Sequence, residues 1–135
     1  MALGVLDTST LILLARIVGT DTLPSEPLIT AVTLAELSVG PLVATTDEER
    51  AARQAHLQQA EASFSPLPFD AAAARSFGQV AASLRRSGRK PTARSYDAMI
   101  AATCLANGLP IHTCNPSNFE GIGGLVVIDV PHPDS

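Results

Sequence analysis

Apolar runs and helix-like segments alternate along the first part of the chain. Residues 3–6 form a short apolar run that ends at Asp7, which predicts a buried strand. The apolar stretch of residues 8–17 that follows is long enough for a helix. Residues 28–32 are rich in the residue types of a second buried strand. The order strand, acid, helix, strand is typical of an α/β unit.

The next segments favour helices. Thr33 and Glu36 have the spacing of a capping box, which predicts that a helix begins here. The Gly40–Pro41 pair is expected to end or kink that helix early. Residues 46–62 are polar, rich in helix formers and acidic at their start, so we expect a solvent-facing helix.

The second half repeats the alternation. Residues 64–69 hold two prolines in an apolar run, which predicts an edge strand. Asp70 is expected to cap a helix that ends near Arg86. The remaining expected elements are a helix over 95–107 with Asn107–Gly108 as its stop signal, a strand over 111–113, a helical turn over 115–119 and a strand over 125–130.

Strands that alternate with helices indicate a parallel sheet covered on both faces, and hence the α/β class. In such sheets the residues just past the carboxyl ends of the strands share one crevice. Asp7 and the segment 113–115 would then lie together, so we expect the functional site at that edge.

Composition narrows the class of protein. A chain of 135 residues, 46% of them hydrophobic, fits a single domain over residues 1–135. Its formal charge of -4 argues against a protein that coats nucleic acid through its overall charge, so contact with RNA would have to be local. The apolar start carries Asp7 and Arg16 and lacks the pattern of a signal peptide or a membrane span. We therefore expect a cytoplasmic protein, with Cys104 and Cys114 reduced.

Three acids stand where a carboxylate is costly. Asp7 ends an apolar strand, Glu36 lies inside a helix, and Asp97 lies on the apolar stripe of another helix. A shared Mg²⁺ or Mn²⁺ ion would offset these charges, because both cations prefer oxygen ligands. The alternative is structural: Asp7 caps a helix, Glu36 closes a capping box with Thr33, and Asp97 sits at the positive end of its own helix. For each acid taken alone the structural interpretation is favoured; the three together favour a site.

The order of several short strings resembles the PIN domain of VapC-type toxins. The strings are LDTSTLI (residues 6–12), TLAELSVG (33–40), YDAMIAATCLANGLPIHTCN (96–115), Asn118–Phe119 and GLVVIDV (124–130). Each is weak alone, but their order and spacing are specific and span nearly the whole chain. The resemblance implies a three-layer α/β/α fold with a parallel sheet of four or five strands.

The resemblance also implies a function. It implies Mg²⁺- or Mn²⁺-dependent cleavage of RNA by an endoribonuclease that is the toxin of a type II toxin–antitoxin pair, with a VapB-type antitoxin as partner and a homodimer as the assembly. By position, Asp7, Glu36 and Asp97 match the acids of such sites, and Thr8 and Thr113 match hydroxyls beside the metal. In the hypothetical mechanism, Asp7 and Asp97 hold the cation, while Glu36 positions a water molecule or accepts its proton.

The chain departs from the family pattern at a fourth corner. Family members commonly place another acid in the segment 113–119, yet the two candidate positions here, Asn115 and Asn118, are amides. An amide oxygen can ligate a cation or hold a water molecule, but it carries no charge. We therefore expect a mainly one-metal site.

Basic residues gather in one stretch of this acidic chain. Five of the nine lie within ten positions: Arg85, Arg86, Arg89, Lys90 and Arg94. They are a candidate RNA-phosphate contact. Equally, they could be a solvated helix end whose cations suit the negative pole of the helix dipole.

Two other functions fit parts of the sequence. A PIN scaffold without its fourth acid could bind RNA or a partner without turnover. The apolar face of the first helix, with Leu11, Ile12, Leu14 and Ile17, offers surface for such a partner. A phosphate-accepting receiver domain also uses acids at strand ends, but it would need a lysine after a late strand, and the single lysine, Lys90, is in an expected loop.

Overall fold

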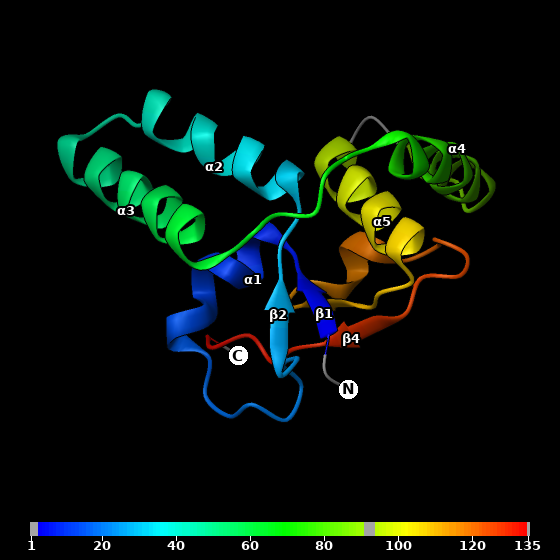
Figure 1. Ribbon diagram of the computed structural model, residues 1–135, viewed down its shortest axis with the longest axis horizontal. Helices are drawn as coiled ribbons and strands as arrows, with labels where there is room; N and C mark the ends of the chain where they lie inside the picture. The colour runs from blue at the N-terminus through cyan, green and yellow to red at the C-terminus, as the bar shows by residue number, and fades with distance from the viewer. Residues whose placement is uncertain (1–2, 91–93, 135) are drawn as a thin grey trace.

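A parallel sheet of four strands forms the centre of the computed structural model, which describes residues 3–90 and 94–134. The strand order is β2-β1-β3-β4, and every neighbouring pair is parallel. The strands are β1 (Leu3–Leu6), β2 (Glu26–Leu28), β3 (Ile111–Thr113) and β4 (Val127–Asp129) (Figure 1). The expected α/β class and parallel sheet are confirmed.

Helices cover the sheet to give three α/β/α layers. α2 packs against α3 and α4 against α5, and Figure 1 shows these two pairs as separate arms above the sheet, with α1 below the first pair. The helices are α1 (Thr8–Leu13), α2 (Ala31–Leu42), α3 (Asp47–Ser63), α4 (Ala71–Arg86) and α5 (Ser95–Asn107), and the 3-10 turns are η1 (Leu14–Arg16) and η3 (Pro116–Phe119). In the described residues, no helix has the length and apolar character needed to cross a membrane.

The core is built on β1, β3 and α5. Val5 and Ile111 from the two central strands are fully buried with Ile100, Ala101 and Cys104 of α5. The apolar stripe expected on that helix is therefore confirmed. Gly108, with a φ of 64°, ends α5 in the left-handed conformation that glycine adopts at little cost.

The start of α2 differs from the expectation. The strand prediction over 28–32 is wrong, because β2 ends at Leu28 and α2 begins at Ala31. The capping box of Thr33 with Glu36 is also wrong: the N-cap is Thr30, whose side chain accepts from the Thr33 backbone N–H at 3.4 Å. Both Thr33 and Glu36 are thereby placed inside the helix, where their side chains are available for other contacts.

Two proline signals had different outcomes. α2 continues one residue past Pro41 to Leu42, so the Gly40–Pro41 pair marks its last turn. The strand expected over 64–69 is reduced to a single bridge between Thr30 and Leu67. Leu67 is flanked by two prolines, which have no N–H to continue a ladder of hydrogen bonds.

Parallel pairing brings the expected site together. Leu6 of β1 is in register with His112 of β3, so the next residues, Asp7 and Thr113, reach the same edge of the sheet. α5 and α2 begin above this edge (Figure 1).

Candidate metal centre

Asp7 is a helix cap and also the centre of a polar network. Its Oδ1 accepts from the Thr10 backbone N–H at 3.3 Å, as the structural interpretation required. Its Oδ2 also accepts from the Thr113 hydroxyl at 2.9 Å and the Ser9 hydroxyl at 3.3 Å. The residue is only 2% exposed. A cap alone would need one of these contacts, so the remainder fix the direction of the carboxylate.

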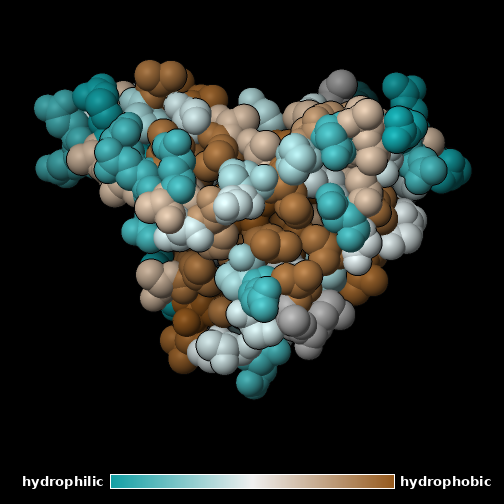
Figure 2. All heavy atoms as spheres, in the orientation of Figure 1, coloured by the Kyte–Doolittle hydropathy of each residue, from teal (hydrophilic) through white to brown (hydrophobic). Residues whose placement is uncertain are grey.

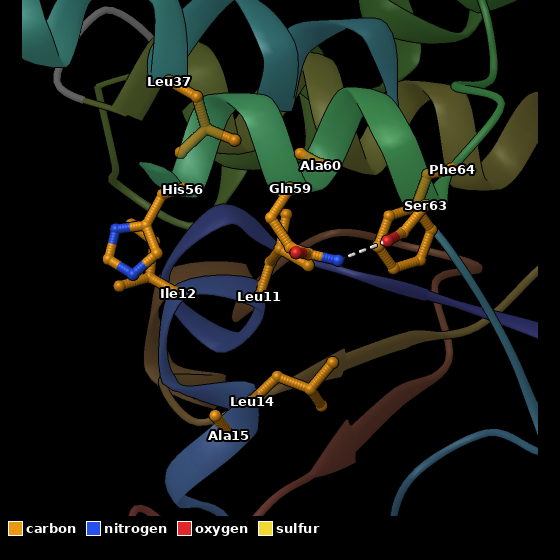
Figure 3. A pocket seen from close by; sticks show the side chains of 10 residues that line it. All are labelled: Leu11, Ile12, Leu14, Ala15, Leu37, His56, Gln59, Ala60, Ser63 and Phe64. Carbon is orange, nitrogen blue, oxygen red and sulfur yellow. Dashed lines mark hydrogen bonds between the residues drawn. The ribbon is translucent and has the colours of Figure 1, made fainter. Parts of the chain in front are cut away.

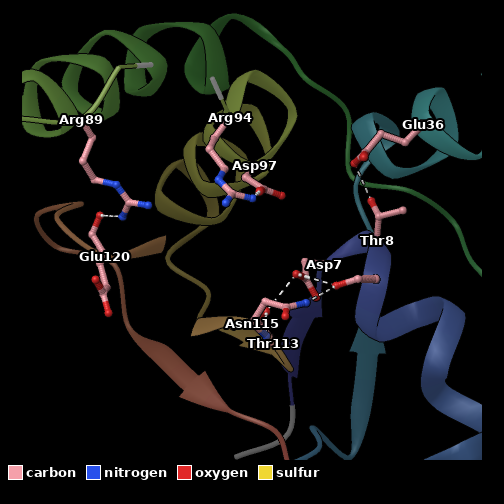
Figure 4. Close-up of polar contacts among 10 residues, drawn as sticks. Asp7, Thr8, Glu36, Arg89, Arg94, Asp97, Thr113, Asn115 and Glu120 are labelled. Carbon is pink, nitrogen blue, oxygen red and sulfur yellow. Dashed lines mark hydrogen bonds and ion pairs between the residues drawn. The ribbon is translucent and has the colours of Figure 1, made fainter. Parts of the chain in front are cut away.

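Asn115 closes this network from the other side. Its backbone N–H donates to the Thr113 hydroxyl at 2.9 Å, and its side-chain Nδ2 donates to the Ser9 hydroxyl at 3.0 Å (Figure 4). Asn118 lies in η3, and its backbone N–H donates to the carbonyl of the N-cap residue Asn115 at 3.0 Å. Of the two amide candidates, Asn115 is therefore the one joined to Asp7.

Glu36 is held by a residue of a different helix. Its Oε1 accepts from the Thr8 hydroxyl at 2.6 Å, and the Thr8 and Thr33 hydroxyls lie 2.9 Å apart. Burial raises the pKa of Glu36; the hydrogen bond from Thr8 opposes this, and the charges of Asp97 and Asp7 add to it. The carboxylate thus lies within electrostatic range of both other acids.

Asp97 occupies the first turn of α5, beside Arg94. Its Oδ2 lies 4.0 Å from Nη1 of Arg94, and its side chain is 21% exposed. Burial raises the pKa of Asp97, the charge of Asp7 raises it further, and Arg94 lowers it. Two of the three acids are therefore harder to ionise than in water, partly because they repel a neighbouring carboxylate.

The three acids border one space from three separate elements (Figure 4). They are spread across it: in the described part of the chain, no three His, Cys, Asp or Glu side chains are grouped closely enough to hold a metal ion between them. Mg²⁺ keeps several water ligands and takes only one or two carboxylates directly. Oxygen donors and mutual repulsion between carboxylates therefore fit a hard cation that keeps several of its own water ligands.

Neither thiol fits a catalytic role. Cys104 and Cys114 are free and buried. Burial raises the pKa of Cys104 to about 12, and burial likewise raises the pKa of Cys114. Both thiols therefore stay protonated at neutral pH, so neither supplies a nucleophile.

The basic cluster begins beside the acids and extends away from them. Arg94 reaches toward Asp97, and Arg89 lies farther out, donating to the Glu120 carbonyl at 2.8 Å (Figure 4). Arg86 donates to the Ser83 hydroxyl at 3.2 Å. Arg85 and Lys90 are exposed. Some side chains of the cluster therefore make contacts within the chain, whereas Arg85 and Lys90 present their charges to solvent.

Sequence reasoning identified the hydroxyls of Thr8 and Thr113 but missed two further ones near the acids, those of Ser9 and Thr33. Ser9 joins Asn115 to Asp7. Thr33 was placed at a helix start, whereas it is fully buried against Thr8. The available signal was the run of hydroxyl residues directly after Asp7, which is unusual within an apolar segment.

Comparisons with known proteins agree with this architecture. The family model described as "PIN domain" matches residues 5–124. Ribonuclease VapC5 of Mycobacterium tuberculosis is 37% identical over 131 residues, covering 96% of this chain and 94% of that protein. The tRNA(fMet)-specific endonuclease VapC of Shigella flexneri is 46% identical over 59 residues, 44% of this chain and 43% of that protein.

A solved structure has the same fold. It is the crystal structure of VapBC-5 from Mycobacterium tuberculosis, a member of the VapBC family of toxin–antitoxin systems. The TM-score is 0.79 at 36% sequence identity, and the match covers 96% of this chain and 100% of the matched chain.

Proposed function

The chain belongs to the PIN-domain family and is a toxin of the VapC type, and from this premise we propose that it is an endoribonuclease that hydrolyses RNA with Mg²⁺ or Mn²⁺. The observation that carries the proposal is that three acids from distant parts of the sequence lie within electrostatic range of one another: the charges of Asp97 and Asp7 add to the burial that raises the pKa of Glu36, and the charge of Asp7 adds to the burial that raises the pKa of Asp97. The relatives named as a ribonuclease and an endonuclease support the reaction class.

Each acid has a distinct part in the proposed reaction. Asp7, fixed by three hydrogen bonds, and Asp97, at the start of α5, would hold the cation. When bound, the cation supplies acidity to a water molecule and offsets negative charge at the scissile phosphate. Glu36, aimed by Thr8, orients the attacking water or accepts its proton. Its raised pKa makes Glu36 a better proton acceptor than an ordinary carboxylate.

We assign RNA contact to the basic cluster, defined as Arg85, Arg86, Arg89, Lys90 and Arg94. It begins next to Asp97, so a phosphodiester at the acids would have its neighbouring phosphates within reach of these side chains. Arg94 also reduces the repulsion that a phosphate meets from the acids. These contacts would fix the position of the strand without reading its bases.

A VapB-type antitoxin is the partner that fits the apolar groove between α1, α2 and α3. The groove has a volume of about 510 Å³ and is lined by Leu11, Ile12, Leu14, Ala15, Leu37, His56, Gln59, Ala60, Ser63 and Phe64 (Figure 3). Figure 2 shows hydrophobic surface gathered below α3, and Ile12 is 40% exposed. The VapBC-5 relative was solved as a toxin–antitoxin system, which supplies the class of occupant. We further propose a homodimer, to be tested by light scattering of the isolated chain.

The test of the function is RNA cleavage by the purified chain with and without Mn²⁺. We expect cleavage with Mn²⁺, none after EDTA, and none from Asp7→Asn. Asparagine is as good an N-cap as aspartate, so this variant keeps α1 while removing the charge. RNA binding without cleavage by the unaltered chain would instead favour a binding module on a PIN scaffold, the second candidate, which the neutral Asn115 and Asn118 favour.

A further inference from the structure

The hydrogen bonds around Asp7 have a direction that is set by Asn115. The Thr113 hydroxyl accepts from the Asn115 backbone N–H at 2.9 Å and donates to Asp7 Oδ2 at 2.9 Å. The Ser9 hydroxyl accepts from Asn115 Nδ2 at 3.0 Å and donates to the same Oδ2 at 3.3 Å. One residue therefore lies behind both hydroxyls that meet Asp7 (Figure 4).

The arrangement leaves each hydroxyl one choice. A hydroxyl has a single proton, and an N–H group can only donate. With Asn115 donating to both, the protons of Ser9 and Thr113 must point away from Asn115, and Asp7 Oδ2 is the acceptor that each then meets. The carboxylate, 2% exposed, is thus held in one orientation by donors that cannot reverse.

We propose that Asn115, acting through Ser9 and Thr113, is the positioning residue of Asp7, and that its neutral side chain limits the site to one tightly bound divalent cation. This inference rests on the proposed metal-dependent function. The charge at the site comes from three acids, and Arg94, 4.0 Å from Asp97, offsets part of it. On the side of Asp7 where Asn115 lies, a second cation would meet a neutral amide and no further charge, so its affinity there is low.

Replacing Asn115 by aspartate changes both properties at once. The new carboxylate adds the missing charge, which favours a second cation. It can also only accept, so it competes with Asp7 for the proton of Ser9. Ser9→Ala removes one hydroxyl without changing the charge, and Ser9→Thr restores a hydroxyl at the same position.

Calorimetric titration of the full chain with MnCl₂ tests the proposal without using activity. We expect one tight Mn²⁺ for the unaltered chain and two for Asn115→Asp. Ser9→Ala should keep one Mn²⁺ at roughly tenfold lower affinity, the size seen when residues behind a metal ligand are removed, and Ser9→Thr should recover it. Asn118→Asp is the matched control, because it adds the same charge three residues away, and it should keep one tight Mn²⁺.

Several results would overturn one or both parts of the proposal, the positioning role of Asn115 and the single tight cation. Two equally tight Mn²⁺ ions in the unaltered chain would reject the one-cation site, and equal affinity in Ser9→Ala would reject the link to Asp7. A second ion in Asn118→Asp as well would show a nonspecific effect of charge. If Asn115→Asp does not fold, the Ser9 pair of variants decides the question. The expected titrations with no RNA cleavage would reject the nuclease and leave the positioning role standing.

Discussion

The acid-lined edge of the sheet and the apolar groove are two surfaces of opposite chemistry on the same helices. α1 presents Thr8 to Glu36 at the acid edge, while its Leu11 and Ile12 line the groove. α2 likewise carries Glu36 on one side and Leu37 on the other. Both surfaces lower the stability of the isolated chain. Carboxylates repel one another at the acid-lined edge, and apolar side chains face water in the groove.

The difference lies in how each surface can be relieved. The acid edge needs a small positive ion, whose fit depends on the direction of a few oxygen atoms. The groove needs an apolar partner, whose fit depends on buried area spread over many side chains. Single substitutions should therefore act sharply at the edge and by increments in the groove.

Removing one charge at the edge should have the largest effect. Asp7→Asn or Asp97→Asn should lower metal-dependent RNA cleavage by about a thousandfold or more, because the held cation supplies several kcal/mol of transition-state stabilisation. Single-turnover cleavage at saturating Mn²⁺ measures this. Antitoxin binding should be unchanged, and retained cleavage in both variants would remove these acids from the mechanism.

Placing a charge in the groove should have the next largest effect. It should lower the affinity for the antitoxin and leave RNA cleavage unchanged. Ile12→Asp or Leu14→Asp buries an unpaired carboxylate against the antitoxin, so affinity should fall by about a hundredfold. Biolayer interferometry with the VapB-type antitoxin measures this, with Val18→Asp as control, because Val18 is 94% exposed and outside the groove. Equal loss in the control, or lost RNA cleavage, would break the separation of the two surfaces.

The sequence predicted the edge better than the details that shape it. Alternating strands and helices placed Asp7 and Thr113 at neighbouring strand ends, because parallel pairing forces that edge to be shared. Asp97 followed from the stripe of α5. The pairing of Glu36 with Thr8 did not follow, because the two lie on helices far apart in the chain and local spacing favoured a cap.

The errors share a physical cause. Thr30 and Thr33 can both cap a helix, and local propensity does not choose between them; burial of Thr33 against Thr8 does. The apolar run of residues 28–32 predicted a longer strand, although only its first residue, Leu28, pairs in β2. From the sequence, the groove could be predicted only as surplus hydrophobic surface on the first helix, because its other wall comes from α3.

Reversing charge in the basic cluster should have a moderate effect that links the edge to its substrate. Lys90→Glu removes an exposed cation, so RNA binding should weaken several-fold and the slope of log affinity against log salt should fall by about one. Filter binding at several salt concentrations measures this, with Mg²⁺ omitted to prevent cleavage. Arg50→Glu, at the far tip of α2 and α3, serves as the control. Identical slopes in the two variants would make the cluster a solvated helix end.

The smallest expected effect is on the free energy of unfolding. It tests whether repulsion between carboxylates destabilises the acid-lined edge, as exposure of apolar side chains destabilises the groove. Because the pKa of Asp97 is raised in the folded chain, the folded state holds that proton more tightly than the unfolded state. Stability from this group is present at low pH and is lost as pH rises through the raised pKa. At pH 7 without metal, Asp97→Asn should therefore raise the melting temperature by a few degrees, an effect on the order of 1 kcal/mol.

With Mn²⁺ added, the unaltered chain should have a higher melting temperature than Asp97→Asn, because the cation stabilises the chain with Asp97 more than the chain without it. Thermal unfolding at pH 4 and pH 7, with EDTA and with Mn²⁺, measures both effects. Glu48→Gln, which removes an exposed charge from the first turn of α3, is the matched control and should show neither the pH-dependent gain nor the reversal. A lower melting temperature for Asp97→Asn in EDTA would mean that the Asp97 carboxylate stabilises the folded chain. The apolar groove would then be the one surface of the two that is unfavourable in the isolated chain.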